Sequence, residues 1–284
     1  MNFHGYPYTF VSQVHLIIEN LERSVTFYRD MLGLQVLHRT ETKVVFTANG
    51  KTPLVTIEQP DKVVPKEPRT TGLYHFALLV PQRADLANIL FHLLQKGYPL
   101  QGASDHLVSE ALYLADPDGN GIEIYVDRPS KTWIWDGDNV GMSTEPLDIE
   151  GLLQENKEQD WQRMPSETIM GHIHLQVADL KQAEEFYTQG LGFEVTSRYG
   201  SQALFISTGK YHHHIGLNTW GSAGAPAPSP NSVGLQSYTL VLSDEESRER
   251  MVQQVKNMGA SIIEENGVII TKDPFGTTIH LVVY

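Results

Sequence analysis

The chain contains no cysteine among its 284 residues. A disulfide framework, a thiolate zinc site and a catalytic cysteine are therefore all excluded, and a reducing, cytoplasmic location is expected. No apolar run approaches the roughly 18 residues that cross a bilayer. The first residues also lack the basic and apolar segments of an export signal. We therefore expect neither export by such a signal nor insertion into a membrane.

Basic residues are scarce as well, with 21 Lys and Arg against 34 Asp and Glu and a formal net charge of -13. This charge repels a phosphate backbone, and no dense basic cluster offsets the repulsion, so nucleic acid is not an expected partner. What the chain does contain is 40% hydrophobic residues. At this length, that is enough for about two domains with separate cores.

The sequence repeats itself, and the repeat constrains the whole fold. Three pairs of similar segments carry it: residues 14–36 with 173–195, residues 72–80 with 234–242, and residues 116–125 with 273–282. The chain therefore consists of four related modules, which begin near residues 11, 72, 170 and 234.

Each module has the pattern of one strand, one helix and three further strands. In the first module, alternation over residues 14–18 predicts a strand, Asn20 caps a helix over about residues 21–31, and Gly33 ends it. The other helices are expected after Asp179, over residues 82–96 ending at Gly97, and over residues 244–258 ending at Gly259.

The predicted fold class is α+β, with four βαβββ modules in tandem that form two domains. Modules one and two make a first domain over residues 1–127, and modules three and four make a second over residues 169–284. Residues 128–168 lie outside the repeat and are interpreted as a linker. We expect a short helix over about residues 148–156 and no chemistry in this linker.

A βαβββ module directs side chains into its cavity from the start of its first strand and the middle of its last. Two facing modules can therefore present up to four ligands. The residues at these positions differ between modules: Gln13 and Glu58 in the first, His75 and Glu123 in the second, His172 with His214 or Asn218 in the third, and Ser237 and His280 in the fourth. The modules have diverged most where a metal ion would bind.

The residues alone leave alternatives open. His172 and His174 share a face of their strand, so either could be the ligand. A single histidine in an apolar strand, such as His75, is usually a core residue, although its place in the repeat favours a ligand. Strand alternation does not decide whether Glu123 faces a cavity or the solvent.

The repeat and its motifs resemble the vicinal oxygen chelate superfamily, which includes glyoxalase I, extradiol dioxygenases and antibiotic-resistance proteins. Over nearly its whole length the chain is similar to the Bacillus-type catechol 2,3-dioxygenases. The segments that carry this resemblance are TGLYHFALLVP from Thr71, DHLVSEALYLADPDGNGIEIYVDRP from Asp105, GHIHLQVADL from Gly171 and YHHHIGLNTW from Tyr211. The resemblance implies two glyoxalase-like domains.

The resemblance also implies an Fe(II)-dependent extradiol dioxygenase that opens catechol or a related aromatic diol with O2. Such enzymes hold Fe(II) through two histidines and one carboxylate. Only modules two and three together supply that set, as His75, Glu123 and His172. His172 is preferred to His174 because its distance from Asp179 matches the family's first-strand ligand. The site is therefore expected to lie between the two repeats.

The family further implies side chains that handle protons. The matching positions are His213 as acid/base, with His214 as second choice, and His106 and Tyr113 ahead of the carboxylate. Alternation places His213 on the opposite face from His212 and His214. A histidine suits this task because its ordinary pKa, about 6.5, lies near neutrality.

Two rival hypotheses remain at this point. Gln13, Glu58, His75 and Glu123 resemble the four-ligand site of glyoxalase I, which works on nickel or zinc, although this reading leaves His172 without a role. The other rival is a non-catalytic protein that binds a small aromatic molecule or an antibiotic. The sequence is compatible with a homo-oligomer and does not identify the diol.

Overall fold

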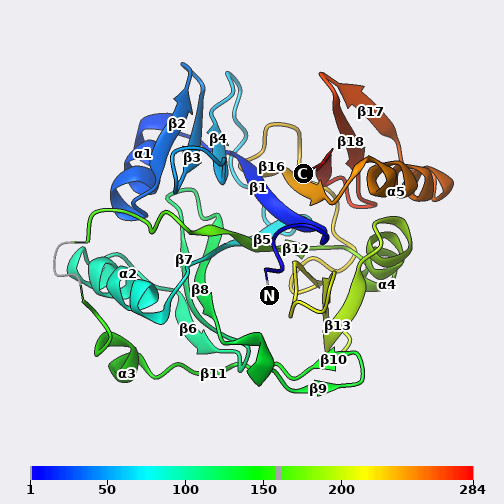
Figure 1. Cartoon of the computed structure of the whole chain (residues 1–284). Coiled ribbons are helices and arrows are strands. Elements are labelled where there is room, and N and C mark those ends of the chain that lie inside the picture. Colours follow the sequence, from blue (N-terminus) through cyan, green and yellow to red (C-terminus); the bar gives the residue numbers. More distant parts are fainter. Residues whose placement is uncertain (1, 158–160, 284) are drawn as a thin grey trace.

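The computed structural model describes residues 2–157 and 161–283 and confirms the α+β class. The first strands of the four modules lie in the middle of the molecule, and the main helix of each module lies on the outside (Figure 1). None of the helices in the described ranges combines the length and apolar character that crossing a bilayer requires.

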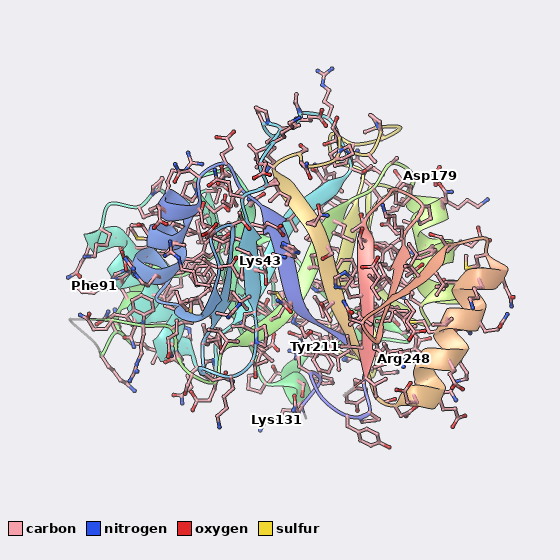
Figure 2. The ribbon with its side chains drawn as sticks, turned by 90° about the horizontal axis from the view of Figure 1, so that it is seen from above. Lys43, Phe91, Lys131, Asp179, Tyr211 and Arg248 are labelled. Atoms are coloured by element: carbon pink, nitrogen blue, oxygen red, sulfur yellow. The ribbon has the colours of Figure 1, made fainter. Side chains whose placement is uncertain are left out.

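One large sheet is built from modules one and four, which are the two ends of the chain. In order across the sheet, its strands are β17 (Ile262–Glu265), β18 (Val268–Lys272), β19 (Thr278–Val283), β16 (Gly234–Leu242), β1 (Phe10–Ile17), β4 (Val55–Glu58), β3 (Lys43–Thr47) and β2 (Gln35–Arg39). The antiparallel pair of β1 and β16 joins the two modules and crosses the middle of the molecule (Figure 2).

The other large sheet is built from modules two and three. Its strands follow the order β11 (Glu145–Pro146), β6 (Gly102–Asp105), β7 (Ser109–Ala115), β8 (Gly121–Asp127), β5 (Gly72–Leu79), β12 (Ile169–Gln176), β15 (Ile215–Asn218), β14 (Ala203–Ser207) and β13 (Glu194–Tyr199). The antiparallel pair of β5 and β12 joins the two modules. The predicted pairing of module two with module three, across the repeats, is therefore confirmed.

The main helices are α1 (Leu21–Thr26), α2 (Arg83–Gln95), α4 (Leu180–Glu185) and α5 (Glu245–Asn257). The predicted caps of α1 and α4 are confirmed, because Asn20 accepts a hydrogen bond from the Arg23 N–H and Asp179 accepts one from the Gln182 N–H. The sequence did not predict that each of these helices continues into a π-helical turn, η1 (Phe27–Met31) and η3 (Phe186–Gly190).

Each π-helical turn carries a buried tyrosine that ties one module to the next. Tyr28 donates a hydrogen bond to Asp116 at 2.9 Å, and Tyr187 donates one to Asp273 at 3.0 Å. Both aspartates stand in the Asp-Pro turn before the last strand of the following module. The same buried contact therefore joins module one to module two and module three to module four.

The segment between the repeats is more structured than a linker. It contains η2 (Ser130–Thr132), a ribbon of β9 (Trp135–Asp136) and β10 (Asn139–Val140), the strand β11, and α3 (Ile149–Leu153) within the predicted helical stretch. The strand β11 pairs with β6 and so becomes one edge of the sheet from modules two and three. The segment thus reaches the part of the molecule where the candidate ligands lie.

Candidate metal centre

His75, Glu123 and His172 come together on three neighbouring strands, β5, β8 and β12. Oε2 of Glu123 lies 3.0 Å from Nε2 of His75 and 3.1 Å from Nε2 of His172. The ligand atoms of the three side chains lie within 4.8 Å of one another, and all three side chains are buried. This is a compact set of two imidazole nitrogens and one carboxylate.

The strand register explains how the three side chains meet. In the parallel pair of β5 and β8, His75 lies opposite Gly121 and Ala77 lies opposite Glu123. A bulge at Gly171 in β12 places His172 opposite Ala77 as well. Glu123 is only 3% exposed, so it faces the interior, which alternation alone had left open. The small side chains between the ligands leave them room to converge.

The electrostatics favour a neutral His172 beside an ionised Glu123. Burial lowers the pKa of His172 to about 4, although the neighbouring Glu123 acts in the opposite direction. Burial alone would raise the pKa of Glu123, but His172 and His75 hold it well below its usual value. Neutral imidazole and ionised carboxylate are the forms that coordinate a metal ion.

An unsatisfied buried nitrogen indicates that a metal ion fits this set. Nε2 of His75 lies close to the Glu123 carboxylate but has no hydrogen-bond partner in the described chain. Nδ1 of His172, on the other side of that ring from Glu123, also has no partner among the described residues. Buried polar atoms without partners are rare, and each needs an explanation. A cation between His75, Glu123 and His172 would engage the lone pair of His75 that the protein leaves unused.

Gly121 makes the close approach of β8 to β5 possible, so Gly121→Ala is expected to destabilise the protein. A Cβ at this position would collide with the backbone carbonyl of Tyr74 and lie 3.1 Å from Cβ of His75. Overpacking of this kind costs ~1–3 kcal/mol. Chemical denaturation of the metal-free protein measures the loss. Gly102→Ala is the matched control, because a Cβ there meets nothing within 4 Å. Equal stability of the two variants would contradict the expectation.

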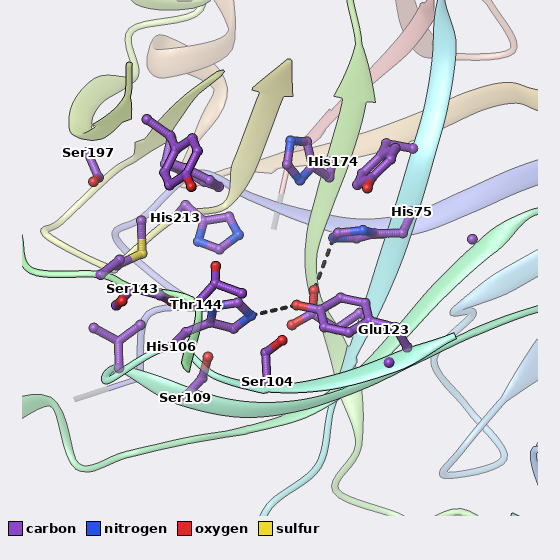
Figure 3. Close-up of a pocket in the computed structure, with 18 of the residues that line it drawn as sticks. His75, Ser104, His106, Ser109, Glu123, Ser143, Thr144, His174, Ser197 and His213 are labelled. Carbon is purple, nitrogen blue, oxygen red and sulfur yellow. Dashed lines mark hydrogen bonds and ion pairs between the residues drawn. The ribbon is translucent and has the colours of Figure 1, made fainter. Parts of the chain in front are cut away.

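The ligand set opens onto a cavity of about 550 Å³ between modules two and three. His75 and Glu123 are part of its wall, as Figure 3 shows. Tyr74, Phe205 and Trp220 supply aromatic surface to the same cavity. A volume of this size is in the range of small-molecule sites.

His106 and Tyr113 form a hydrogen-bonded pair in the cavity wall, with 2.6 Å between Nε2 of His106 and the tyrosine hydroxyl (Figure 3). Nδ1 of His106 donates to the backbone carbonyl of Ser143 at 2.7 Å. Met142 and Thr144 line the cavity beside Ser143. The segment between the repeats, in which the sequence showed no recognisable chemistry, therefore contributes to the cavity wall and holds His106.

The structure separates His213 from His214. His213 lines the cavity, and its ring centre lies 4.1 Å from that of His172. His214 is not part of the cavity wall. It is fully buried, donates through Nε2 to the backbone carbonyl of Phe3, and accepts through Nδ1 from the Thr208 N–H. The second choice for the acid/base position therefore lies in the protein core against the N-terminal segment.

His174, the alternative ligand, lies beside the metal centre but outside the cluster of ligand atoms. Its ring lies 5.0 Å from that of His75 (Figure 3). The same ring packs near Phe205 and Trp220. Nε2 of His174 is buried and finds no hydrogen-bond partner in the described ranges. His174 is therefore a polar element of the cavity wall.

The four-ligand alternative is wrong for this fold. Gln13 and Glu58 lie on β1 and β4, in the sheet that contains neither His75 nor Glu123. Gln13 donates to Thr56, and Glu58 is engaged by Lys43 and His15, each at 2.9 Å. The module pairing therefore keeps the four proposed ligands in two separate sheets.

In the described ranges, His75, Glu123 and His172 are the one group with metal-ligand geometry. Ser237 and His280, the equivalent positions of module four, lie on β16 and β19 in the other sheet. They are not part of such a group.

The buried histidines predict that the metal-free protein loses stability as the pH falls. Burial lowers the pKa of His172 and of His15 from 6.5 to about 4, and it holds the pKa of His174, His213 and His214 well below the usual value. Below pH 6.5 these histidines bind protons in the unfolded chain but remain neutral in the folded chain. The free energy of unfolding therefore decreases towards pH 4. Each fully suppressed group contributes up to ~1.4 kcal/mol per pH unit.

Urea denaturation of the metal-free protein at pH 7, 6 and 5 measures this slope, and a loss of several kcal/mol is expected. His15→Gln removes one of the groups outside the metal centre and should make the slope shallower. Burial raises the pKa of Asp116 and Asp273, which acts in the opposite direction. A free energy of unfolding that stays constant or rises between pH 7 and pH 5 would contradict the prediction.

The fold and the side-chain cluster together define a class of protein: paired βαβββ modules with a buried group of two histidines and one carboxylate that could hold a metal ion. A sequence model of the Glyoxalase/Bleomycin resistance protein/Dioxygenase superfamily matches residues 11–124 and 169–281. The chain belongs to this superfamily, as the sequence motifs had predicted.

Two known proteins and one solved structure show which members of the superfamily this chain is similar to. It is 47% identical over 269 residues to catechol-2,3-dioxygenase of Bacillus subtilis (strain 168), covering 94% of each chain. It is 28% identical over 118 residues to biphenyl-2,3-diol 1,2-dioxygenase 3 of Rhodococcus globerulus, over 40% of this chain and 62% of that protein. The crystal structure of glyoxalase I from Zea mays superposes with a TM-score of 0.59 at 15% identity, over 97% of this chain and 92% of that one. The last similarity shows a shared fold.

Proposed function

We propose that this protein is an extradiol ring-cleaving dioxygenase that opens catechol or a related aromatic diol with O2. The proposed cofactor is a single Fe(II) held by His75, Glu123 and His172. The observation that carries the proposal is the buried set of two histidines and one carboxylate facing a cavity large enough for an aromatic diol. The relative with 47% identity, named catechol-2,3-dioxygenase, supports the same chemistry.

The donor set suits Fe(II) because two imidazoles and one carboxylate on one face leave coordination positions free for other ligands. When bound, the metal supplies a Lewis acid and a path for electrons between diol and dioxygen. Glu123 supplies the negative charge that a divalent ion needs in a buried site. The two neutral histidines bring in no further charge, so the site remains electrophilic.

The cavity wall orients the diol and handles its protons. The aromatic side chains of Phe205 and Trp220 offer flat surfaces for the ring. His213 stands beside the ligand His172, where it can accept a proton from a diol hydroxyl. His106 and Tyr113 form a hydrogen-bonding pair for oxygen atoms of the substrate from another wall (Figure 3). Burial raises the pKa of Tyr113, and the Glu123 charge raises it further, so its hydroxyl stays protonated. This hydroxyl donates to Nε2 of His106, and its oxygen can accept a hydrogen bond from the diol.

The division into domains over residues 1–127 and 169–284 is part of the proposal. The two stretches that match the superfamily, residues 11–124 and 169–281, support it, as do the tyrosine–aspartate contacts within each repeat. The active site then lies where the two domains meet, because β5 belongs to the first and β12 to the second.

Anaerobic reconstitution with Fe(II) followed by oxygen-electrode assays tests the function. A panel of catechol, alkylcatechols and hydroquinones is supplied, and oxygen uptake together with a yellow ring-opened product is expected with at least one of them. The zinc-loaded and metal-free proteins are the controls and should consume no oxygen. Bound Fe(II) without oxygen uptake on any diol would overturn the proposal in favour of a binding protein. Turnover of methylglyoxal and thiol on nickel would overturn it in favour of an isomerase.

A further inference from the structure

A chain of hydrogen bonds leads from His213 away from the cavity. Nδ1 of His213 lies 2.8 Å from Nδ1 of His212, and Nε2 of His212 lies 2.8 Å from Oδ1 of Asp127. His212 is fully buried, and the side chain of Asp127 is 23% exposed at the end of β8. The acid/base candidate is therefore connected to a carboxylate through a second histidine.

For a neutral His212 beside an ionised Asp127, the chemistry of the partners fixes the direction of each hydrogen bond. An ionised carboxylate only accepts, so Nε2–H of His212 donates to Asp127. A neutral His212 then carries its lone pair on Nδ1, and Nδ1–H of His213 must donate to it. His213 is thereby left with its own lone pair on Nε2. This atom has no hydrogen-bond partner within the described residues, and the ring lines the cavity.

The surroundings of Asp127 show that its charge is directed at the histidines. In the part of the chain that the structure describes, no Lys or Arg pairs with Asp127, and its ion pair is with His212. The Tyr211 hydroxyl also donates to Oδ1 of Asp127 at 3.3 Å and lies 2.7 Å from the Tyr125 hydroxyl. The ring of Trp133 lies 5.2 Å from that of His212. Asp127 and His212 thus lie among buried aromatic side chains.

We propose that Asp127 and His212 are positioning residues that fix the tautomer of His213 and present its Nε2 lone pair to the diol. This inference rests on the proposed function. In the step, the O–H bond of one diol hydroxyl breaks, its electron pair stays on oxygen, and the proton forms an N–H bond with Nε2. The positive charge on His213 is then stabilised through His212 by Asp127. The same arrangement of carboxylate, histidine and reacting atom orients the base in serine proteases, extended here by one histidine.

The variants Asp127→Asn and His212→Phe test the chain of hydrogen bonds in the Fe(II)-loaded protein. Each is expected to lower kcat roughly 10- to 100-fold, while KM and iron content change by less than about twofold, because neither residue touches diol or metal. Tyr211→Phe is the matched control, since it removes the other hydrogen bond to Asp127 without breaking the path to His213. Its kcat should stay within about threefold of the wild-type value. In a His213→Gln background, Asp127→Asn should cause no further loss.

A direct readout comes from 15N-histidine spectra of the zinc-loaded chain, which report the tautomer of each imidazole. His213 is expected as the Nδ1–H form in the wild type and as a mixture with the Nε2–H form in Asp127→Asn. A wild-type His213 in the Nε2–H form would overturn the inference, whatever the enzyme does. An equal loss of kcat with and without His213 would also overturn it, because the role of Asp127 would then be structural. A wild type that consumes no oxygen instead defeats the proposed function, and the spectra still decide the tautomer.

Discussion

Replacing His172 with alanine is expected to remove bound Fe(II) almost completely and to lower ring cleavage by roughly 1000-fold or more. The reason is that the three candidate ligand atoms lie within 4.8 Å of one another, so each would contribute to the coordination of one ion under the proposed function. Without His172, the ion keeps one imidazole and one carboxylate, too few to hold it in this cavity. Iron content after desalting and the initial rate of oxygen uptake measure the two effects.

The matched control is His174→Ala on the same face of β12. This variant should retain its iron, because His174 is absent from the ligand cluster, and should change KM, because it lines the cavity. His172→Asn, which keeps more of the side-chain volume, separates loss of the ligand from loss of packing. If His174→Ala released the iron and His172→Ala kept it, the assignment of the ligand would be reversed.

The repeat made most of the fold predictable. Strand alternation, the caps at Asn20 and Asp179, and the helix-ending glycines Gly97 and Gly259 are local signals, and the structure follows all of them. The pairing of strands is not local, since β5 and β12 are far apart in sequence. It became predictable because only modules two and three hold a complete ligand set, so the chemistry of the site indicated the topology.

Other parts of the site could not be read from the sequence. The inward orientation of Glu123 depends on which face of β8 is covered, and alternation gives only two equivalent faces. The contact between His106 and Ser143 joins a module to a segment outside the repeat, so no comparison between modules could show it. Asp127 and His212 likewise have no recognisable motif, and their connection to His213 appears only in three dimensions.

His213→Gln is expected to lower kcat roughly 100- to 10,000-fold while iron binding stays intact. His213 lines the cavity next to His172 and is not in the ligand cluster, so under the proposed function its loss removes the acid/base group and leaves all three ligands in place. Stopped-flow measurement of ring opening on the iron-loaded variant gives the rate, and metal analysis gives the iron content.

His214→Gln is the control that the histidine run itself provides. His214 lies outside the cavity wall and holds the backbone of Phe3 through a buried hydrogen bond. Its replacement should therefore lower the free energy of unfolding by ~1–3 kcal/mol and leave kcat within about threefold of wild type. If His214→Gln lost activity as severely as His213→Gln at full iron occupancy, the face assigned to each histidine would be wrong.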